Sequence, residues 1–288
     1  MMKACYNVEG KVGTILIKLI VSDLDGTLLG FDKRVKNEDK RAIQFAAEQG
    51  IDLAIASGRM DNEILDVLKE LQQKAHRVSQ NGAFIYTKTN LRLHALTFSP
   101  QLARRIYQQV KEWKAIVLVC DENTYFIEET NEHTNEIEKR LFYGLYECPN
   151  MLDAIGKTIH PSKITVLAEN EQIVEFERTI ANQFGNHVDT FISEPRCLDI
   201  MPKNISKGNA VLALMEHLRV QPHEIACFGD AFNDIPMFRL TPYSFAMSHA
   251  HPAVKKEAQY VVHSVSEGIQ MILANAPSAK MMQQKLAD

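Results

Sequence analysis

Cysteine and tryptophan are scarce in this chain of 288 residues, which contains five cysteines and one tryptophan. The cysteines are dispersed along the sequence, at Cys5, Cys120, Cys148, Cys197 and Cys227. Because no two of them have the CxxC spacing of zinc knuckles and redox centres, neither kind of site is visible. An odd number of dispersed cysteines is typical of a reducing compartment, so we expect the protein to be cytoplasmic.

A surplus of basic charge is also lacking. The 32 lysines and arginines are outnumbered by 36 acidic residues, which leaves a net charge of −4 at pH 7. This balance argues against a nucleic-acid partner and against binding to an anionic membrane. The longest apolar run near the start, residues 15–21, is too short to span a bilayer and includes Lys18. No signal-peptide cleavage site follows it, so we expect a soluble protein without a membrane partner.

The overall composition is that of a globular protein, with 45% hydrophobic and 24% charged residues. A chain of this length predicts about two domains. It can bury a large core without being stabilised by disulfides or bound metals.

Two stretches of the chain alternate between buried strands and amphipathic helices. In the first, residues 15–22 and 51–56 are largely apolar runs typical of strands buried on both faces. Residues 37–49 and 62–73 have helical periodicity. The alternation returns in a helix that Ser206 caps, in strands at residues 225–228, 244–247 and 260–262, and in a helix at 233–240. This pattern predicts an α/β fold with a doubly wound, Rossmann-like parallel sheet.

The residues between these stretches have a different pattern. Hairpins are predicted at residues 84–96 and 115–127, helices at 100–113 and 171–184, and strands at 163–168 and 189–193. Hairpins mixed with helices indicate an α+β module inserted into the core domain. The predicted domains are an N-terminal extension (1–14), a discontinuous core (15–85 and 191–275), the inserted module (86–190) and a C-terminal tail (276–288).

The sharpest motif is Asp23-x-Asp25-Gly26-Thr27 at the carboxyl end of the first strand. On extended backbone that leaves a strand, two carboxylates two residues apart point to the same side. Such a pair suits a hard cation, or it divides into a nucleophile and an acid/base. Gly26 permits a tight loop whose amides can face an anion.

Three further features follow predicted strands or begin a helix. Ser57-Gly58-Arg59 ends the second strand, where a hydroxyl and loop amides can hold a phosphoryl oxygen. Lys207 begins a helix, where a cation opposes the helix dipole unless an anion binds there. Gly229-Asp230-x-x-Asn233-Asp234 ends a buried strand and makes a plausible Mg²⁺ site in a crevice shared with Asp23.

Together these motifs resemble those of the haloacid dehalogenase superfamily of phosphatases, and more narrowly its Cof-like branch. Residues 23–27 match the first motif, Ser57 the second, Lys207 the third and residues 229–234 the GDxxND form of the fourth. The Ser-Gln-Asn-Gly-Ala segment at residues 79–83 is similar to the segment that leads into the cap of this branch. The inserted module lies where the superfamily's large α/β (C2) caps lie.

The resemblance implies a two-step phosphatase mechanism. Asp23 would attack phosphorus and form an aspartyl-phosphate, and Asp25 would protonate the leaving oxygen and then activate water. Mg²⁺ would be held by Asp23, the backbone carbonyl of Asp25 and Asp230, while Asp234 would bind through a water or orient Lys207. Lys207 and the metal would neutralise the transferring group. The predicted phosphate- or substrate-binding residues are Gly26, Ser57, Gly58, Arg59, Asn81 and Asn233.

The same residues bear on several alternative functions. A dehalogenase would not need Asp25, and a P-type ATPase would need membrane spans. A phosphomutase or phosphotransferase shares the core and is not excluded. A non-catalytic phosphosugar-binding protein could lose Asp23 or Asp25, yet this chain has both. The resemblance implies a small phosphate ester as substrate, most readily a sugar phosphate, and leaves the oligomeric state open.

Overall fold

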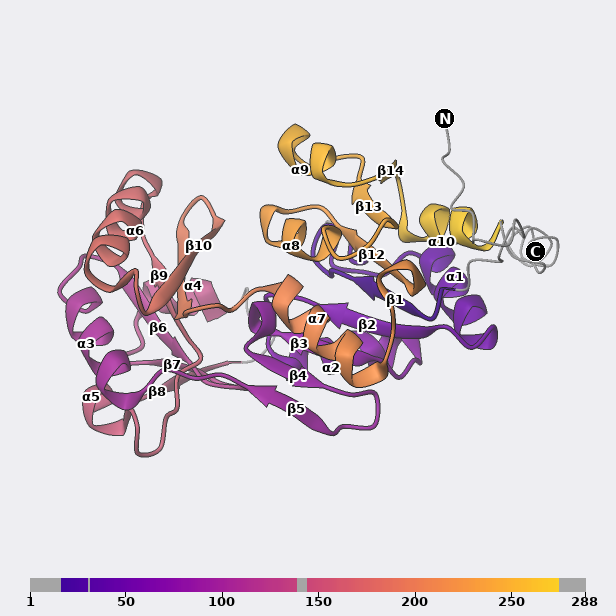
Figure 1. Ribbon diagram of the computed structural model, residues 1–288. Coiled ribbons are helices and arrows are strands. Elements are labelled where there is room, and N and C mark those ends of the chain that lie inside the picture. The colour runs from indigo at the N-terminus through magenta and orange to yellow at the C-terminus, as the bar shows by residue number, and fades with distance from the viewer. Residues whose placement is uncertain (1–16, 31, 139–143, 275–288) are drawn as a thin grey trace. The chain divides into compact units, whose positions relative to one another are not determined.

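The computed structural model describes residues 17–30, 32–138 and 144–274 (Figure 1). Their contacts divide the chain into two units. Unit 1 comprises Met1–Ala56, Glu70–His76 and Val211–Asp288, and unit 2 comprises Ser57–Lys69 and Arg77–Ala210. The predicted bounds of the core and of the inserted module stay a prediction. The predicted extension and tail lie outside the described residues.

Unit 1 contains five parallel strands. They are β1 (Leu19–Ser22), β2 (Asp52–Ala56), β12 (Ile225–Gly229), β13 (Ser244–Met247) and β14 (Tyr260–Val262). Their order is β14-β13-β12-β1-β2. Every residue of β1 and β12 is buried, as in parallel sheets that are covered on both faces. The chain continues from β1 to β2 on one side and from β12 to β13 on the other, so the topological switch point lies between β1 and β12.

Helices connect these strands or follow the last of them. They include α1 (Asn37–Glu48), α8 (Ile235–Phe238), α9 (Pro252–Glu257), α10 (Val265–Leu273), and the 3₁₀ turns η2 (Pro222–Glu224) and η3 (Phe232–Asp234). The residues of α2 (Asp61–Leu71) and α7 (Lys207–Leu218) are divided between the units. α1 packs against α10, and the buried carboxylate of Asp39 accepts a hydrogen bond from the backbone amide of Ser266 at 2.7 Å.

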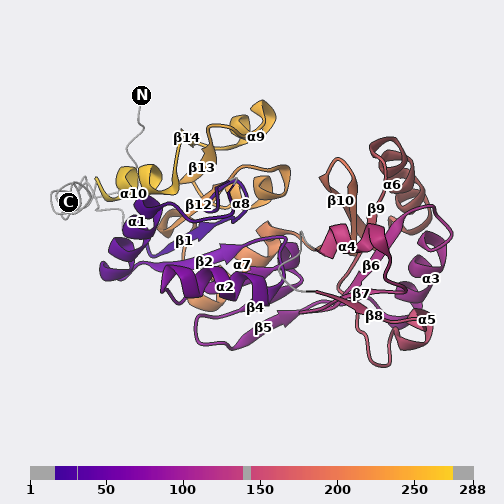
Figure 2. The same cartoon turned by 180° about the vertical axis from the view of Figure 1, so that it is seen from behind.

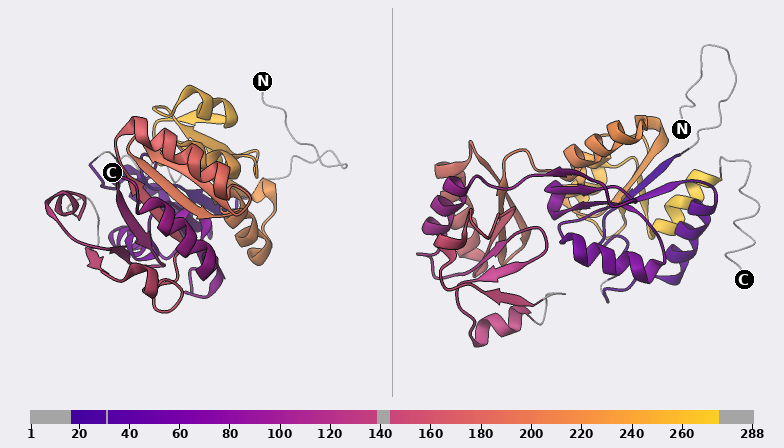
Figure 3. Two further views of the ribbon diagram at one scale, coloured as in Figure 1. Left: turned by 90° about the vertical axis from the view of Figure 1, so that its left-hand side faces the viewer. Right: turned by 90° about the horizontal axis from the view of Figure 1, so that it is seen from below.

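Unit 2 contains a six-stranded sheet in the order β10-β11-β9-β6-β7-β8. Its strands are β6 (Ile116–Cys120), β7 (Tyr125–Ile127), β8 (Leu145–Glu147), β9 (Lys163–Leu167), β10 (Val188–Glu194) and β11 (Cys197–Pro202). All pairs are antiparallel except β7 with β8. Helices α3 (Pro100–Val110) and α6 (Asn170–Phe184) lie together on one face of this sheet (Figures 2 and 3).

The core of unit 2 lies between that face and the two helices. It includes Tyr107, Phe176 and Val166. Trp113 stacks on Phe176, with ring centroids 4.0 Å apart, so the single tryptophan packs against this core. Unit 2 also contains α4 (Glu132–Glu138), α5 (Met151–Ala154), and the strands β4 (Phe84–Tyr86) and β5 (Arg92–Ala95). Strand β3 (His76–Ser79) pairs antiparallel with β4 and lies in unit 2 except for His76, and the turn η1 (Gln80–Gly82) joins the two strands.

The fold class predicted from the sequence is confirmed: unit 1 contains a parallel α/β sheet and unit 2 an α+β arrangement. Two predicted elements differ in the structure. The strand predicted at residues 15–22 begins at Leu19 among the described residues. The helix predicted at 233–240 is divided into η3 and α8, because Pro236 lacks the amide that a continuous helix needs at that position. No helix among the described residues is long and apolar enough to cross a membrane.

Candidate active site

Asp23 and Asp230 follow neighbouring parallel strands of unit 1. β1 ends at Ser22 and β12 at Gly229, and the register pairs Ser22 with Phe228. The backbone amide of Asp23 donates to the carbonyl oxygen of Phe228 at 3.0 Å, which adds one bond to the ladder. The two aspartates therefore leave the same edge of the sheet, next to the switch point where α/β folds bind their ligands.

A tight turn after β1 brings Thr27 to Asp230. The backbone amides of Thr27 and Leu29 donate to the carbonyl oxygen of Leu24, at 3.2 and 2.7 Å. Gly26 has a φ of +81°, a conformation that costs glycine little. The Thr27 hydroxyl then donates to Asp230 Oδ1 at 2.7 Å. The turn therefore orients one carboxylate oxygen of Asp230.

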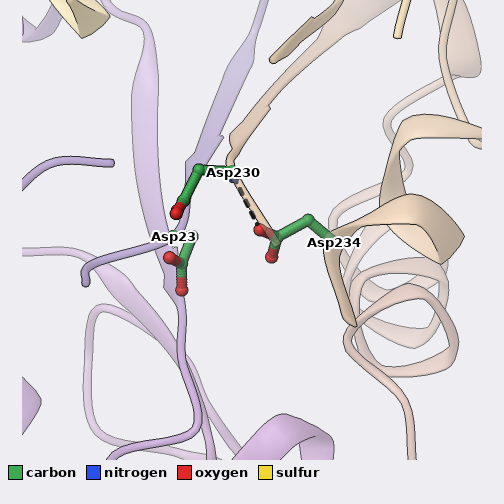
Figure 4. Close-up of side chains that lie close together, drawn as sticks. All are labelled: Asp23, Asp230 and Asp234. Atoms are coloured by element: carbon green, nitrogen blue, oxygen red, sulfur yellow. Dashed lines mark hydrogen bonds between the residues drawn. The ribbon is translucent and has the colours of Figure 1, made fainter. Parts of the chain in front are cut away.

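Asp234 shapes the loop that follows β12. Its Oδ2 accepts a hydrogen bond from the backbone amide of Asp230 (Figure 4) and another from that of Ala231, each at 2.9 Å. The Asp234 side chain is fully buried. A Cβ at Gly229 would lie 2.5 Å from Asp234 Oδ2. Glycine at this position therefore lets the carboxylate approach the backbone.

Asp23, Asp230 and Asp234 form a carboxylate cluster. One oxygen from each lies within 4.8 Å of the others (Figure 4). Carboxylates gathered away from bulk water repel one another, and a hard cation with oxygen ligands relieves that repulsion. A Cβ at Gly26 would lie 2.4 Å from Asp230 Oδ2, so glycine leaves the space beside the cluster open. The donor set and this space fit a divalent metal ion.

Two other polar groups lie close to the cluster. His249 Nε2 is 3.8 Å from Asp230 Oδ2. Burial, together with the charge of Asp234, raises the pKa of the Cys227 thiol. A neutral thiol is a poor metal ligand, and the three side chains of the cluster itself supply carboxylate oxygens.

The segment that holds Ser57, Gly58 and Arg59 belongs to unit 2, as does Asn81. The backbone amide of Asn81 donates to the carbonyl oxygen of Ser57 at 2.9 Å. The backbone amide of Arg59 donates to Ser57 Oγ at 3.2 Å. A Cβ built on Gly58 would lie 3.4 Å from Asn81 Oδ1. Unit 2 therefore brings these four predicted residues together.

Lys207 is the first residue of α7 and is buried. The hydroxyl of Ser206 accepts a hydrogen bond from the backbone amide of Asn209 at 3.0 Å, and so caps the helix as predicted. A Cβ at Gly82 would lie 2.7 Å from the carbonyl oxygen of Ser206. The Asn81-Gly82 segment therefore packs against the start of α7, in the same unit as Lys207.

The predicted site residues are thus divided between the two units. Unit 1 holds Asp23, Asp25, Gly26, Asp230, Asn233 and Asp234, and unit 2 holds Ser57, Gly58, Arg59, Asn81 and Lys207. Asp25 is exposed and Asn233 is half-buried within η3. The individual roles given to these residues stay predictions. The bond from Thr27 to Asp230 was not predicted, because spacing in the sequence does not show which carboxylate a distant hydroxyl reaches.

A family model described as haloacid dehalogenase-like hydrolase matches residues 20–273. The chain belongs to this family. The matched range contains every predicted site residue, and the family predicted from the motifs is confirmed.

Curated relatives and a solved structure agree with this membership. The chain is 26% identical over 250 residues to the HMP-PP phosphatase of Klebsiella pneumoniae, which covers 85% of this chain and 89% of the relative. It is 24% identical over 247 residues to the HMP-PP phosphatase of Cronobacter sakazakii, with the same coverage. The crystal structure of TM0651 from Thermotoga maritima superposes with a TM-score of 0.81 at 26% identity, covering 89% of this chain and 97% of that one.

These findings support the predicted enzyme class: this haloacid dehalogenase-like hydrolase is a phosphatase. The buried acidic cluster fits a metal site, as predicted, and the identity of the metal stays a prediction.

Proposed function

We propose that this hydrolase is a Mg²⁺-dependent phosphatase of small organic phosphate monoesters, with sugar phosphates as the favoured class and Asp23 as the nucleophile. The observation that carries the proposal is the carboxylate cluster of Asp23, Asp230 and Asp234, whose oxygens lie within 4.8 Å of one another. It stands at the carboxyl ends of β1 and β12, beside the switch point of the sheet.

Mg²⁺ would be held by the carboxylates of Asp23 and Asp230 and by the backbone carbonyl of Asp25, with Asp234 bound through a water or placed to orient Lys207. When bound, the ion would neutralise charge on the phosphoryl oxygens. Hydrogen bonds from the protein orient these ligands. The Thr27 hydroxyl fixes an oxygen of Asp230, and the backbone amides of Asp230 and Ala231 fix an oxygen of Asp234.

In the first step, a carboxylate oxygen of Asp23 forms a bond to phosphorus and the bond from phosphorus to the ester oxygen breaks. Asp25 gives its proton to the departing alkoxide, which leaves as an alcohol. In the second step, Asp25 takes a proton from water as that water attacks phosphorus. The bond between Asp23 and phosphorus then breaks and inorganic phosphate leaves. The exposed position of Asp25 is compatible with contact to a substrate.

The other predicted residues are assigned to the phosphoryl group. We propose that Lys207 balances its charge and that Ser57 donates its hydroxyl to one oxygen. Loop amides at Gly26 and Gly58 would face the remaining oxygens. Arg59, Asn81 and Asn233 would bind polar groups of the substrate.

The substrate class rests on the resemblance to the Cof-like branch and on the relatives. Relatives from Klebsiella and Cronobacter are named HMP-PP phosphatases, and together with the resemblance this favours small phosphate esters for this chain. The cytoplasmic location expected from the cysteines stays a prediction.

A phosphate-release screen tests the proposal. Purified protein would be offered a panel of sugar phosphates, flavin mononucleotide and pyridoxal phosphate, with Mg²⁺, with Ca²⁺ and after chelation. We expect release with Mg²⁺, little with Ca²⁺, because it favours a larger and looser coordination shell, and none after chelation. Release that is unaffected by chelation would contradict the metal assignment. A folded protein that only moves phosphate between sugar positions would be a phosphomutase.

A further inference from the structure

Three consecutive residues between β3 and β4 have left-handed backbones. The φ angles are +48° at Gln80, +56° at Asn81 and +113° at Gly82. Glycine and asparagine adopt such angles readily, whereas a residue with a long side chain such as glutamine rarely does. A conformation of this kind persists only where the surroundings hold it, and it often marks a functional position. Gln80 is the residue of the three that needs an explanation.

The side chain of Gln80 is fully buried and uses both ends of its amide. Nε2 donates to the carbonyl oxygens of Asp121 and Glu122, at 2.7 and 3.2 Å. Oε1 accepts a hydrogen bond from the Ser162 hydroxyl at 2.7 Å. These partners lie just after β6 and just before β9, which are neighbouring strands of the six-stranded sheet. One side chain therefore holds one end of that sheet.

The backbone of the same segment holds the Ser57 loop, which we define as residues 57–59. The amide of Gln80 donates to the carbonyl oxygen of Arg59 at 2.8 Å, and the amide of Asn81 donates to that of Ser57 at 2.9 Å. The positive φ at Gln80 directs the backbone to the loop and the side chain to the sheet. Gln80 therefore takes part in both attachments, through its side chain to the sheet and through its backbone amide to the loop.

The β6–β7 turn, residues 121–124, is closed by hydrogen bonds of its own, and its carbonyl oxygens accept hydrogen bonds from side chains outside it. Asp121 Oδ1 accepts hydrogen bonds from the backbone amides of Asn123 and Thr124, at 3.1 and 3.0 Å. The side-chain Nδ2 of Asn62, near the start of α2, donates to the carbonyl oxygen of Asn123 at 3.2 Å. These bonds connect the turn to itself and to α2, the helix that directly follows the Ser57 loop.

We infer that Gln80 is a positioning residue that couples the six-stranded sheet to the Ser57 loop, and so sets the geometry of phosphoryl binding. This inference rests on the proposed function, in which Ser57 holds a phosphoryl oxygen. Gln80 acts through Ser57 and does not contact the reacting atoms. A small displacement of a positioned group can cost a large factor in rate.

The test compares Gln80→Ala with Gln108→Ala, a matched loss of an exposed glutamine on α3. With p-nitrophenyl phosphate and Mg²⁺, Gln80→Ala is expected to lower kcat at least tenfold and to change KM less than threefold. Gln108→Ala is expected to keep both constants. Equal kcat values for Gln80→Ala and wild type would overturn the inference.

Two variants separate hydrogen bonding from filling of space. Gln80→Glu keeps the size of the side chain but loses the N–H groups that face two carbonyl oxygens, so we expect a loss in kcat similar to that of Gln80→Ala. Full activity of Gln80→Glu would show that only packing matters. Ser162→Ala removes one partner and tests the inference even where the Gln80 variants fold poorly. It is expected to lower kcat about threefold alone and to add nothing to Gln80→Ala; independent, multiplied losses would contradict the coupling.

Amide hydrogen exchange gives a readout that does not need activity. Gln80→Ala is expected to speed exchange in the β6–β7 turn and also in the segment of residues 57–62, while Gln108→Ala changes neither. Faster exchange in the turn alone would overturn the coupling. If folded wild-type protein released no phosphate from any ester, the proposed function would fail. The exchange result would still decide whether Gln80 links the sheet to the Ser57 loop.

Discussion

The hydroxyl of Thr27 donates a 2.7 Å hydrogen bond to Oδ1 of Asp230, a residue 203 positions further along the chain. The two residues meet because β1 and β12 are parallel neighbours and because the turn after β1 folds back at Gly26. A carboxylate held in this way presents its oxygens in a fixed direction. Groups that orient a metal ligand commonly change metal affinity when they are lost.

Replacing Thr27 with valine keeps the shape of the side chain and removes the hydroxyl. Because Asp230 then loses this hydrogen bond, we expect the concentration of Mg²⁺ that half-saturates activity to rise roughly 10- to 100-fold. Thr27→Ser keeps the donor and should restore most of the affinity. An unchanged Mg²⁺ requirement in folded Thr27→Val would show that the bond does not orient the metal ligand.

The variant Gly26→Ala tests whether metal binding needs the open space beside the carboxylate cluster. The new Cβ would lie 2.4 Å from Asp230 Oδ2, so the carboxylate must move and Mg²⁺ affinity is expected to fall at least about tenfold. Gly50→Ala is a matched control, because Gly50 has nearly the same φ, +80°, and nothing within 4 Å of its added Cβ.

Both alanine variants should lose stability, about 1 kcal/mol for the left-handed backbone, when unfolding is followed in urea. Only Gly26→Ala should also lose metal affinity. If both variants weakened Mg²⁺ binding equally, backbone strain rather than the space at Asp230 would be the cause.

Asp39 provides a pH-dependent contribution to stability. Burial raises the pKa of this carboxyl from 3.8 to about 6, against the opposing hydrogen bond from the backbone amide of Ser266. Between these two pH values the folded protein holds a proton that the unfolded chain has released. The free energy of unfolding therefore falls as pH rises from about 4 to about 6, by up to about 3 kcal/mol from this group.

Asp39→Asn removes that titration. The free energy of unfolding of the variant, minus that of wild type, should increase from pH 4 to pH 6 and be constant above pH 7. Urea unfolding across this range measures the difference. Glu48→Gln, at the exposed other end of α1, controls for the loss of a carboxyl as such. A difference that is flat, or that falls with rising pH, would contradict burial as the cause of the shift.

Motifs and apolar runs allowed much of unit 1 to be predicted. The run in β1 and the motif of residues 23–27 together place Asp23 at the end of a buried strand, as observed. Strand β11 was not predicted, although it pairs with both β9 and β10. Its residues include Asp199, whose buried carboxylate accepts a bond from Thr165, and such a polar position interrupts the apolar pattern that marks a strand.

The links between distant residues could not be predicted either. In the sequence Gln80 belongs to a short motif and carries no further signal, because its bonds to Ser162 and to the β6–β7 turn depend on how strands β6 and β9 align. A sequence pattern reports local periodicity and spacing, whereas such bonds are set by tertiary register.

The central claim is that Asp23 is the nucleophile of a phosphatase. The most direct measurement compares phosphate release by wild type and by Asp23→Asn, prepared in the same way, on the best ester of the panel with saturating Mg²⁺. Matching circular dichroism spectra and unfolding midpoints would show that both proteins are folded. We expect release by wild type and loss of release by at least about a thousandfold in Asp23→Asn, whose amide cannot form the aspartyl-phosphate. Substantial release by the folded Asp23→Asn protein would contradict the account.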